Sequence, residues 1–247
     1  MLKLIGGTKL LSFLGKYSRW KEFKKEFAKF SSLSQKNRFT LKWDDRYPCL
    51  DDKTKTTSFD RHYLYHPAWA ARILAETKPS KHVDISSTLN FSSILSAFIP
   101  VEFYDFRPAD VKLTNLESKA ADIVSLPFDN NSVKSLSCMH VVEHIGLGRY
   151  GDPIDPNGDI KAIDELKRVL AINGNLLFVV PVGKPKIQFN AHRVYSYEQI
   201  TELFSELELV QFVLISERSE DGGLNIGVNA EDVSHQDYGC GCFWFKK

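Results

Sequence analysis

Short apolar runs of strand length alternate with amphipathic stretches of helical length from residue 82 onward. The runs are rich in β-branched and aromatic residues and lie at 82–86, 101–106, 132–140, 175–182, 209–217 and 240–247. Apolar residues at helical spacing lie at 90–98, 159–170 and 196–207. Because strands that alternate with single helices need crossover connections, the pattern predicts an α/β fold with a mainly parallel, doubly wound sheet covered by helices on both faces.

The last two strand-like runs differ from the others, because residues 217–239 between them show no helical pattern. Two consecutive strands joined without a crossover helix pair in the antiparallel sense. The sequence therefore predicts an antiparallel hairpin at one edge of the sheet, joined by a loop.

Residues 1–36 form a basic segment with its own pattern. Nine lysines and arginines face only two acidic residues, and aromatic positions such as Trp20, Phe23 and Phe27 recur at helical spacing. The favoured interpretation is a solvated helix whose aromatic face covers its own domain. The alternative is a basic amphipathic helix that makes a peripheral contact with an anionic membrane.

A polar, irregular stretch at 37–60 precedes a predicted helix at 66–77, with Pro67 in its first turn and Pro79 after its end. The predicted organisation is thus a basic helical segment at 1–78 followed by a sheet domain at 79–247.

Composition narrows the class of protein further. The 247 residues are 43% hydrophobic and 26% charged, as in ordinary soluble domains. A net charge of +1 gives no global field for nucleic acid, so no nucleic-acid partner is predicted. Four scattered cysteines form no disulfide framework, and Cys240 and Cys242 are interpreted as reduced thiols on the last strand. With no signal peptide or membrane-spanning run in the sequence, a cytoplasmic location is predicted.

Polar residues at the carboxyl ends of the predicted strands form the candidate site, because ligands of open parallel sheets bind there. The first three ends supply Asp84 and Ser86, then Asp105, then Asp122 followed by Leu126. A carboxylate such as Asp105 can accept hydrogen bonds from two neighbouring hydroxyl groups.

The fourth and fifth strand ends are denser in reactive groups. His140, Glu143 and His144 follow the fourth strand and begin a long, glycine-punctuated loop. The remaining candidates for substrate binding or catalysis are Arg149, Tyr150, Asp152, Asn190, His192 and Arg193. His140 and His144 share a helical face and resemble a partial metal site. No third ligand is fixed by local spacing, so no metal is predicted.

The order of elements over residues 122–181 resembles the second half of a seven-strand S-adenosylmethionine-dependent methyltransferase. It runs from an acidic turn through Leu-Pro-Phe, a strand, a polar loop and a helix to an Asn-Gly turn and an apolar strand. Across residues 40–247, the segments HYLYHPAWAAR, HVDIS, EHIGLGRYGDP and FNAHRVYS are similar to the domain-of-unknown-function family first named from Caenorhabditis.

The resemblance implies a Rossmann-like, seven-strand sheet with S-adenosylmethionine as cofactor. In such enzymes the first strand ends in Asp-x-Gly-x-Gly-x-Gly; here Asp84 matches the acid, whereas Ser86, Thr88 and Asn90 replace the glycines. The resemblance further implies that Asp105 holds the ribose and that Asp122, with Leu126, meets the adenine. The segment that contains His62 and Tyr63 would then act as a lid over the cofactor.

These assignments predict methyl transfer to a small polar acceptor, such as a sugar or a carboxylate-bearing molecule. His140 or His192 would take the acceptor proton, with Glu143 and His144 beside them. Two alternatives remain open. One is a methyltransferase-like binding module without cofactor, and the other is a metal-assisted or nucleotide-sugar-handling enzyme that uses the EHIGLGRYGDP loop.

Overall fold

The computed structural model describes residues 4–33 and 38–247, with side chains from residue 15 onward. The chain forms two compact units, residues 1–58 and residues 59–247. Helix α2 (Arg61–Thr77), which is part of the predicted segment 1–78, lies in the second unit. Within the described ranges, none of the helices combines the length and the apolar character that crossing a bilayer requires.

The first unit consists of the long helix α1 (Leu4–Leu33), a short 3-10 helix η1 (Trp43–Asp45) and irregular chain. Trp20, Phe23 and Phe27 of α1 surround the ring of Trp43, with ring centroids 4.9–6.3 Å from it. These three positions share one helical face, so part of the aromatic face is used inside this unit. The membrane contact predicted for residues 1–36 stays a prediction, and residues 1–3 and 34–36 lie outside the described part of the chain.

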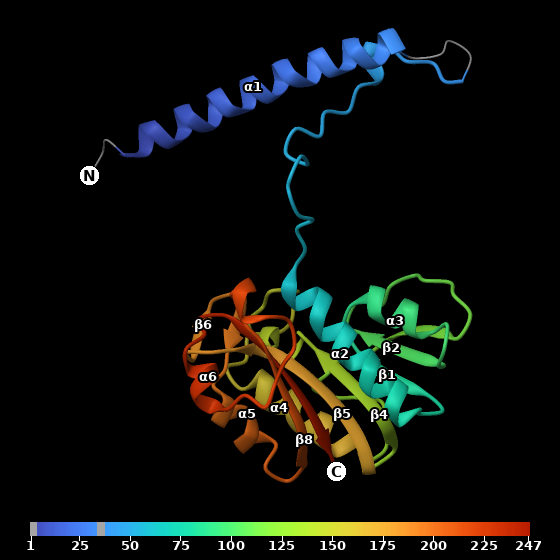
Figure 1. Cartoon of the computed structure of the whole chain (residues 1–247). Helices are drawn as coiled ribbons and strands as arrows, with labels where there is room; N and C mark the ends of the chain where they lie inside the picture. Colours follow the sequence, from blue (N-terminus) through green and yellow to red (C-terminus); the bar gives the residue numbers. More distant parts are fainter. Residues whose placement is uncertain (1–3, 34–37) are drawn as a thin grey trace. The chain divides into compact units, whose positions relative to one another are not determined.

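The second unit is built on one eight-stranded sheet with the strand order β3-β2-β1-β4-β5-β10-β8-β9 (Figure 1). The strands are β1 (His82–Ile85), β2 (Val101–Asp105), β3 (Leu116–Ala120), β4 (Val133–Met139), β5 (Leu170–Val182), β8 (Glu208–Ile215), β9 (Asn225–Ile226) and β10 (Gly239–Lys246). Strands β1 to β5 pair in parallel with their neighbours, in the spatial order β3-β2-β1-β4-β5. Strand β10 runs antiparallel to both β5 and β8. The predicted doubly wound, mainly parallel sheet and the antiparallel pairing of the last two long strands are confirmed.

Several details differ from the prediction. The sheet has eight strands because the two-residue β9 pairs with β8 at the edge. The segment 217–239 is not a plain loop: it holds η3 (Ser219–Asp221) and the short helix α6 (Ala230–Ser234), which Asn229 caps through the amides of Glu231 and Asp232. The helix predicted from residue 66 begins at Arg61, since Asp60 accepts the Tyr63 amide and caps it there, so Pro67 lies inside the helix.

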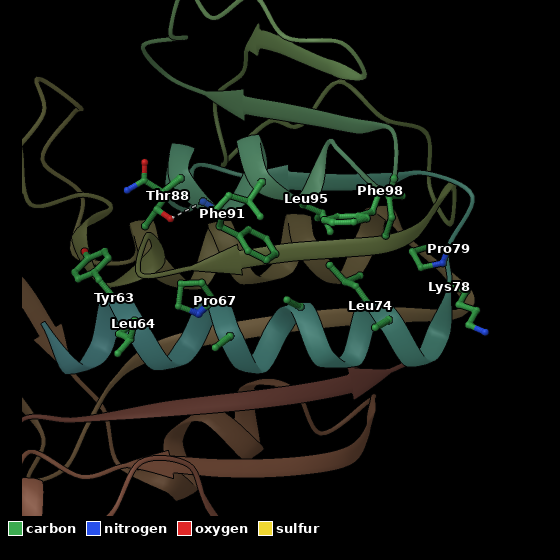
Figure 2. A pocket seen from close by; sticks show the side chains of 16 residues that line it. Tyr63, Leu64, Pro67, Leu74, Lys78, Pro79, Thr88, Phe91, Leu95 and Phe98 are labelled. Carbon is green, nitrogen blue, oxygen red and sulfur yellow. Dashed lines mark hydrogen bonds between the residues drawn. The ribbon is translucent and has the colours of Figure 1, made fainter. Parts of the chain in front are cut away.

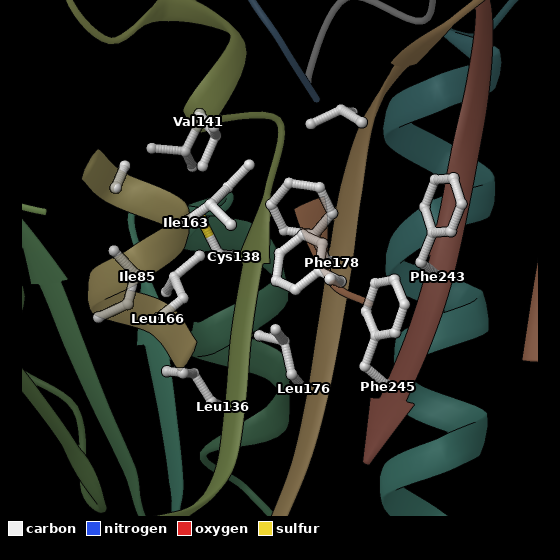
Figure 3. Close-up of a cluster of buried hydrophobic side chains, with 14 of the residues drawn as sticks. Ile85, Leu136, Cys138, Val141, Ile163, Leu166, Leu176, Phe178, Phe243 and Phe245 are labelled. Atoms are coloured by element: carbon white, nitrogen blue, oxygen red, sulfur yellow. The ribbon is translucent and has the colours of Figure 1, made fainter. Parts of the chain in front are cut away.

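Helices cover both faces of the sheet. On one face α2 and α3 (Leu89–Leu95) pack over Met139, Leu177 and Val179. On the other, α4 (Gly158–Val169) and α5 (Tyr197–Leu203) pack over a larger cluster. Figure 3 shows this cluster, with Phe178 of β5 beside Phe243 and Phe245 of β10 and with side chains of α4 facing them. Alternating residues of β5 enter opposite clusters, as the two-residue period of a strand requires.

Two smaller elements shape the carboxyl edge of the sheet. After β4 the chain forms η2 (Val142–His144) and a long loop that leads into α4. After β5 it forms a separate hairpin of β6 (Lys186–Gln188) and β7 (His192–Val194). Because β4 and β5 are neighbours, these two excursions lie side by side above the sheet.

Candidate active site at the carboxyl edge of the sheet

A pocket of about 420 Å³ lies beyond the carboxyl ends of the parallel strands. Its lining includes Ser86 after β1, Asp105 at the end of β2, Asp122 after β3 and His140 after β4. The end of η2 supplies His144, and the loop between η2 and α4 supplies further lining residues, among them Gly146, Tyr150 and Pro153. Four successive strand ends therefore converge on one cavity of a size typical of small-molecule sites.

Two residues predicted to bind cofactor lie away from this pocket. Asp84 is fully buried and accepts hydrogen bonds from Ser137, at 2.6 Å, and from Ser92. Burial outweighs these hydrogen bonds and raises the pKa of Asp84 to about 6. Leu126 is packed in the core cluster, and its amide donates to Glu165. Both side chains are therefore buried below the strand ends and do not line the cavity.

Ser86 takes the backbone conformation that a glycine usually provides. Its φ is 52°, and its amide and its hydroxyl both donate to the carbonyl of Tyr104, at 2.8 and 3.0 Å. A left-handed conformation at a non-glycine residue costs about 1 kcal/mol, and these two bonds hold it. Thr88 has extended backbone and caps α3 by accepting the Phe91 amide, while Asn90 lies within α3. Of the three replaced glycine positions, only position 86 is left-handed.

The two acids at the next strand ends share a local arrangement. Asp105 accepts the amide of Arg107 at 2.7 Å, and Asp122 accepts the amide of Val124 at 3.1 Å. Each turn is held through one carboxylate oxygen and directs the acid toward the pocket edge. The Arg107 guanidinium lies over the ring of Tyr150, 4.7 Å from its centroid, and joins this acidic side of the pocket to the loop.

His140 is the centre of a buried polar cluster beside the pocket. Its Nδ1 donates to Glu143 at 2.8 Å, and its Nε2 lies 3.4 Å from the sulfur of Cys240. His140 is 7% exposed, whereas Glu143 and Cys240 are 1% and 0% exposed. Burial alone opposes a charge on the imidazole, but the Cys240 sulfur and the Glu143 carboxylate outweigh it and raise the pKa of His140 to about 10. The Glu143 carboxylate thus favours the protonated form of this imidazole.

Aromatic rings of α2 cover this cluster. His62 stacks on His140 with centroids 5.3 Å apart, and Tyr63 stacks on it at 5.4 Å. The ring of His66 lies edge-on to His140, at 5.1 Å. Burial together with the neighbouring His140 lowers the pKa of His62 to about 4 and keeps that of His66 well below its usual range, so both are neutral at pH 7.

His144 lies between the two excursions above the sheet. Its Nδ1 is 2.6 Å from the carbonyl oxygen of Ala191 and must donate to it, because a carbonyl only accepts. This hydrogen bond fixes the tautomer and leaves Nε2 as an acceptor, 3.7 Å from Glu143. Arg149 donates to the same carbonyl at 3.1 Å. The loop after β4 and the β6–β7 hairpin are therefore in direct contact, as the predicted strand order requires.

Two residues predicted to bind the acceptor, Asp152 and Arg193, also hold these segments in place, and Asp152 lines the pocket. Asp152 accepts the amides of Gly146, Gly148 and Tyr150 and so closes the loop on itself. Arg193 is 5% exposed and donates to the carbonyls of Ile145 and Pro156, at 2.7 and 3.2 Å. Neither a free guanidinium nor an open surface is present at Arg193, so it braces the loop.

The other two predicted residues of the hairpin also lie outside the pocket lining. Asn190 is exposed in the turn between β6 and β7. His192 packs on Tyr238 with centroids 4.8 Å apart, and its buried Nε2 has no hydrogen-bond partner among the described residues. His144 and His192 lie on the same side of the sheet, with ring centroids 6.4 Å apart.

Some residues at the site were not predicted from the sequence. Lys161 lines the pocket, and Cys240 and Tyr238 reach the cluster from β10 and the residue before it. Cys240 carried no usable signal, because its partners are distant in sequence and only the insertion of β10 beside β5 brings it to His140.

A second, larger cavity adjoins the site. An apolar groove of about 780 Å³ runs between α2 and α3, and Figure 2 shows Pro67 and Leu74 on one wall and Phe91, Leu95 and Phe98 on the other. Tyr63, which stacks on His140, lines the end of this groove near Thr88. The groove and the 420 Å³ pocket thus approach the histidine cluster from different sides.

Comparison with known proteins gives a partial family match and a fold. Residues 119–236 match the family described as a Caenorhabditis protein of unknown function, DUF268, which confirms the resemblance over this part of the chain. No protein with a curated description matches the chain.

Solved structures share the fold at low sequence identity. The N-methyltransferase NodS from Bradyrhizobium japonicum, in complex with S-adenosyl-L-homocysteine, superposes with a TM-score of 0.51 at 15% identity, over 73% of this chain and 85% of NodS. The protein MccD gives 0.51 at 16% identity over 74% and 96% of the two chains. The [4+2]-cyclase SpnF gives 0.51 at 13% identity over 73% and 81%. These similarities establish the Rossmann-like methyltransferase fold, which hosts more than one chemistry.

Proposed function

We propose that the protein binds S-adenosylmethionine at the carboxyl edge of the sheet and transfers its methyl group to an oxygen or nitrogen atom of a small polar acceptor. The observation that carries this proposal is the convergence of Ser86, Asp105, Asp122 and His140 on one pocket. The shared fold with NodS, whose structure contains S-adenosyl-L-homocysteine, supports the choice of cofactor.

The residues at the pocket fit such a cofactor. Asp105 uses one oxygen for the Arg107 amide, which leaves its other oxygen to accept from a ribose hydroxyl. Asp122 and the backbone around Val124 line the next part of the pocket, where an adenine edge would lie. Left-handed Ser86 bends the chain after β1 without the glycine motif. When bound, the cofactor supplies an electrophilic methyl group on a sulfonium centre.

His144 is the residue best suited to take a proton from the acceptor. It lines the pocket, and its Nδ1–H bond to Ala191 leaves Nε2 free to accept. Methyl transfer depends mainly on alignment of donor and acceptor, and a base of this kind assists by removing the acceptor proton. His140 instead holds a proton tightly and would orient groups beside the donor.

Cationic groups at the pocket favour an acceptor with acidic or hydroxyl groups, such as a sugar or a carboxylic acid. The guanidinium groups of Arg107 and Arg149 flank the ring of Tyr150, at 4.7 and 5.1 Å from its centroid. Lys161 lines the same pocket. Lys161 is paired with Asp155 at 2.7 Å and Arg149 donates to the Ala191 carbonyl, so Arg107 is the cation whose guanidinium best suits an acidic or hydroxyl-bearing acceptor.

Calorimetric titration with S-adenosyl-L-homocysteine tests the cofactor assignment. The wild type is expected to bind with one site per chain, and Asp105→Asn is expected to weaken binding by about tenfold or more, since it loses the charged acceptor for the ribose. The variant keeps an oxygen for the Arg107 amide, so its fold is preserved. Asp129→Asn, an exposed acid away from the pocket, is the control and should bind like the wild type. Absence of binding at millimolar ligand would overturn the proposal.

The replaced glycines favour one second candidate, a binding module that uses the methyltransferase fold without the cofactor. Ser86, Thr88 and Asn90 carry side chains where such enzymes have none, and Thr88 is committed to capping α3. This candidate predicts that the wild type fails the same titration while the 420 Å³ pocket binds another small polar molecule.

A further inference from the structure

Three side chains that bind metals in other proteins meet beside the pocket, although they come from distant parts of the second unit. His62 belongs to α2, His140 follows β4, and Cys240 begins β10. One ligand atom from each lies within 4.8 Å of the other two, and all three residues are buried. We propose that His62, His140 and Cys240 form a binding site for a borderline-soft divalent transition-metal ion, with Zn²⁺ as the ion that their donor set fits. This inference does not rest on the proposed methyl transfer.

The distances suit an ion of this size. Zn²⁺ binds imidazole nitrogen and thiolate sulfur at about 2.0–2.3 Å, so adjacent ligand atoms of a tetrahedral site lie about 3.5 Å apart. The Nε2 atom of His140 and the sulfur of Cys240 are 3.4 Å apart. The third ligand atom lies within 4.8 Å of both. Because the His62 ring is stacked on His140, with 11° between the ring planes, it must turn out of this stack for its lone pair to reach the same ion.

The surroundings of His140 match those of a metal-bound histidine. Such a ligand commonly donates its second ring N–H to a carboxylate, which orients the ring and increases its basicity. His140 donates from Nδ1 to Glu143 at 2.8 Å, so Nε2 is the atom turned toward Cys240. The other oxygen of Glu143 is buried without a partner among the described residues. A cation in the cluster would add to the stabilisation that His140 gives this buried carboxylate.

A second buried polar atom without a hydrogen-bond partner among the described residues, Nε2 of His66, lies in the same cluster. His66 is fully buried, and its Nδ1 donates to the carbonyl of His62 at 2.7 Å, which leaves Nε2 as a lone-pair acceptor. That atom has no partner among the described residues, and its ring lies 5.1 Å from that of His140. Buried polar atoms of native proteins are nearly always satisfied, so two orphans around one ring call for an explanation.

The same residues resemble a cysteine–histidine–carboxylate triad, but burial argues against a nucleophile. A reactive cysteine must be partly exposed to meet its substrate. Cys240 is 0% exposed and lines none of the cavities described above, and rings of His62 and Tyr63 cover the imidazole beside it. A metal ion needs far less room than a substrate and can enter past His140, which lines the 420 Å³ pocket.

Three protein ligands leave a fourth coordination position. Closed structural zinc sites use four protein ligands, whereas catalytic sites use three and keep one position for water or substrate. His140 lines the 420 Å³ pocket, so the ion would lie next to that pocket. The ion would also tie α2 to β4 and β10 at the entrance of the site.

Metal replacement in the full-length protein tests the site. The protein is treated with a chelator, reloaded with Zn²⁺ or Co²⁺, desalted and analysed by elemental mass spectrometry. We expect one ion per chain, and for Co²⁺ a thiolate-to-cobalt charge-transfer band in the wild type, which requires a sulfur ligand without any mutation. Cys240→Ser should abolish that band, and Glu143→Gln should weaken Zn²⁺ binding by roughly 10–100-fold, as expected when the carboxylate partner of a ligand is lost.

Two cysteine variants serve as matched controls. Cys49→Ser changes an exposed thiol of the first unit, and Cys242→Ala changes a buried thiol two residues from Cys240 on the same strand. Both should retain one ion per chain and the charge-transfer band. The proposal is overturned if the reloaded wild type holds no ion, if the cobalt protein lacks a sulfur band, or if Cys240→Ser binds Zn²⁺ as tightly as the wild type.

Titration of S-adenosyl-L-homocysteine into metal-free and reloaded protein separates this inference from the proposed function. If the protein takes up one ion but does not bind S-adenosyl-L-homocysteine, the metal site is supported and the methyltransferase proposal is overturned. If the protein binds S-adenosyl-L-homocysteine but takes up no ion, the methyltransferase proposal is supported and the metal site is overturned.

Discussion

Arg193 lies 3.4 Å from Asp159, and both side chains are less than a tenth exposed. Tyr195 donates to the same carboxylate at 2.9 Å. The pair joins β7 to the start of α4, and the remaining guanidinium nitrogens hold the loop carbonyls of Ile145 and Pro156. The wall of the pocket is thus fixed by an internal ion pair behind it.

Breaking this pair should destabilise the protein strongly. Arg193→Gln leaves the Asp159 carboxylate buried without its cation, which typically costs about 3–5 kcal/mol. Urea unfolding followed by circular dichroism measures the change. Arg149→Gln, an exposed arginine of the same loop, is the control and should change the unfolding free energy by less than about 1 kcal/mol. Equal effects of the two variants would contradict the bracing role of Arg193.

His82 and Asp84 should make stability depend on pH in opposite ways. Burial lowers the pKa of His82 from 6.5 to about 3, so its contribution to stability is lost as pH falls below about 6.5. Burial raises the pKa of Asp84 from 3.8 to about 6, so its cost to stability grows as pH rises from about 4 to 6. Between pH 4 and 6 the two slopes largely cancel in the wild type.

Single variants should reveal each slope. In Asp84→Asn, the slope of the unfolding free energy between pH 4 and 6 should be about 1 kcal/mol per unit more positive than in the wild type, because the opposing contribution of Asp84 is lost while those of the buried histidines remain. In His82→Asn the slope should be more negative than in the wild type by a similar amount. Urea unfolding at pH 4, 5 and 6 decides the matter, and parallel slopes for the two variants would rule out opposed titration.

Loss of Asp152 should loosen the loop over the pocket. Asp152→Ala removes the acceptor of the Gly146, Gly148 and Tyr150 amides. We expect faster tryptic cleavage after Arg149 and, on the proposed function, about tenfold weaker binding of S-adenosyl-L-homocysteine. Asp164→Asn, on the exposed side of α4, should leave both unchanged. An unchanged cleavage rate in Asp152→Ala would show that other contacts hold the loop.

Deletion of the first unit should leave the second unit folded. Removal of residues 1–58 is expected to shift the melting temperature by less than about 3 °C, or about 1 kcal/mol for a domain of this size. Removal of residues 1–78 also takes away α2, whose Trp69, Ile73 and Leu74 are buried in the core, and should prevent folding. Scanning calorimetry of the two truncations tests where the folded second unit begins. A cooperative unfolding transition after removal of residues 1–78 would contradict a boundary at residue 58 and favour one at residue 78.

Periodicity was enough to predict most of the sheet, because each long strand carries its own apolar run. β3 was not among the expected strands: Leu116–Ala120 lies at the edge of the sheet, and only Leu116 is buried, so it lacks the apolar signal. The start of α2 was predicted too late, because its first turn has few apolar residues and its signal is the Asp60 cap.

The candidate site was predictable where it depends on strand ends and not where it depends on side-chain direction. Asp105 and Asp122 reach the pocket because the turns after their strands hold them there. Asp84, Arg193 and His192 were predicted from the same rule but point into packed surroundings. Cys240 could not be assigned, since β10 meets β5 only through the tertiary arrangement of the whole sheet.

The insertion of β10 between β5 and β8 has a consequence for biosynthesis. As the second unit leaves the ribosome, strands β1 to β5 and β8 emerge before the strand that joins the two parts of the sheet. Until residues 239–246 arrive, β5 and β8 each expose a hydrogen-bonding edge beside apolar side chains, which is the kind of nascent surface that aggregates or recruits chaperones. Truncation within these few residues should therefore cost yield of soluble protein far beyond what their share of the chain suggests.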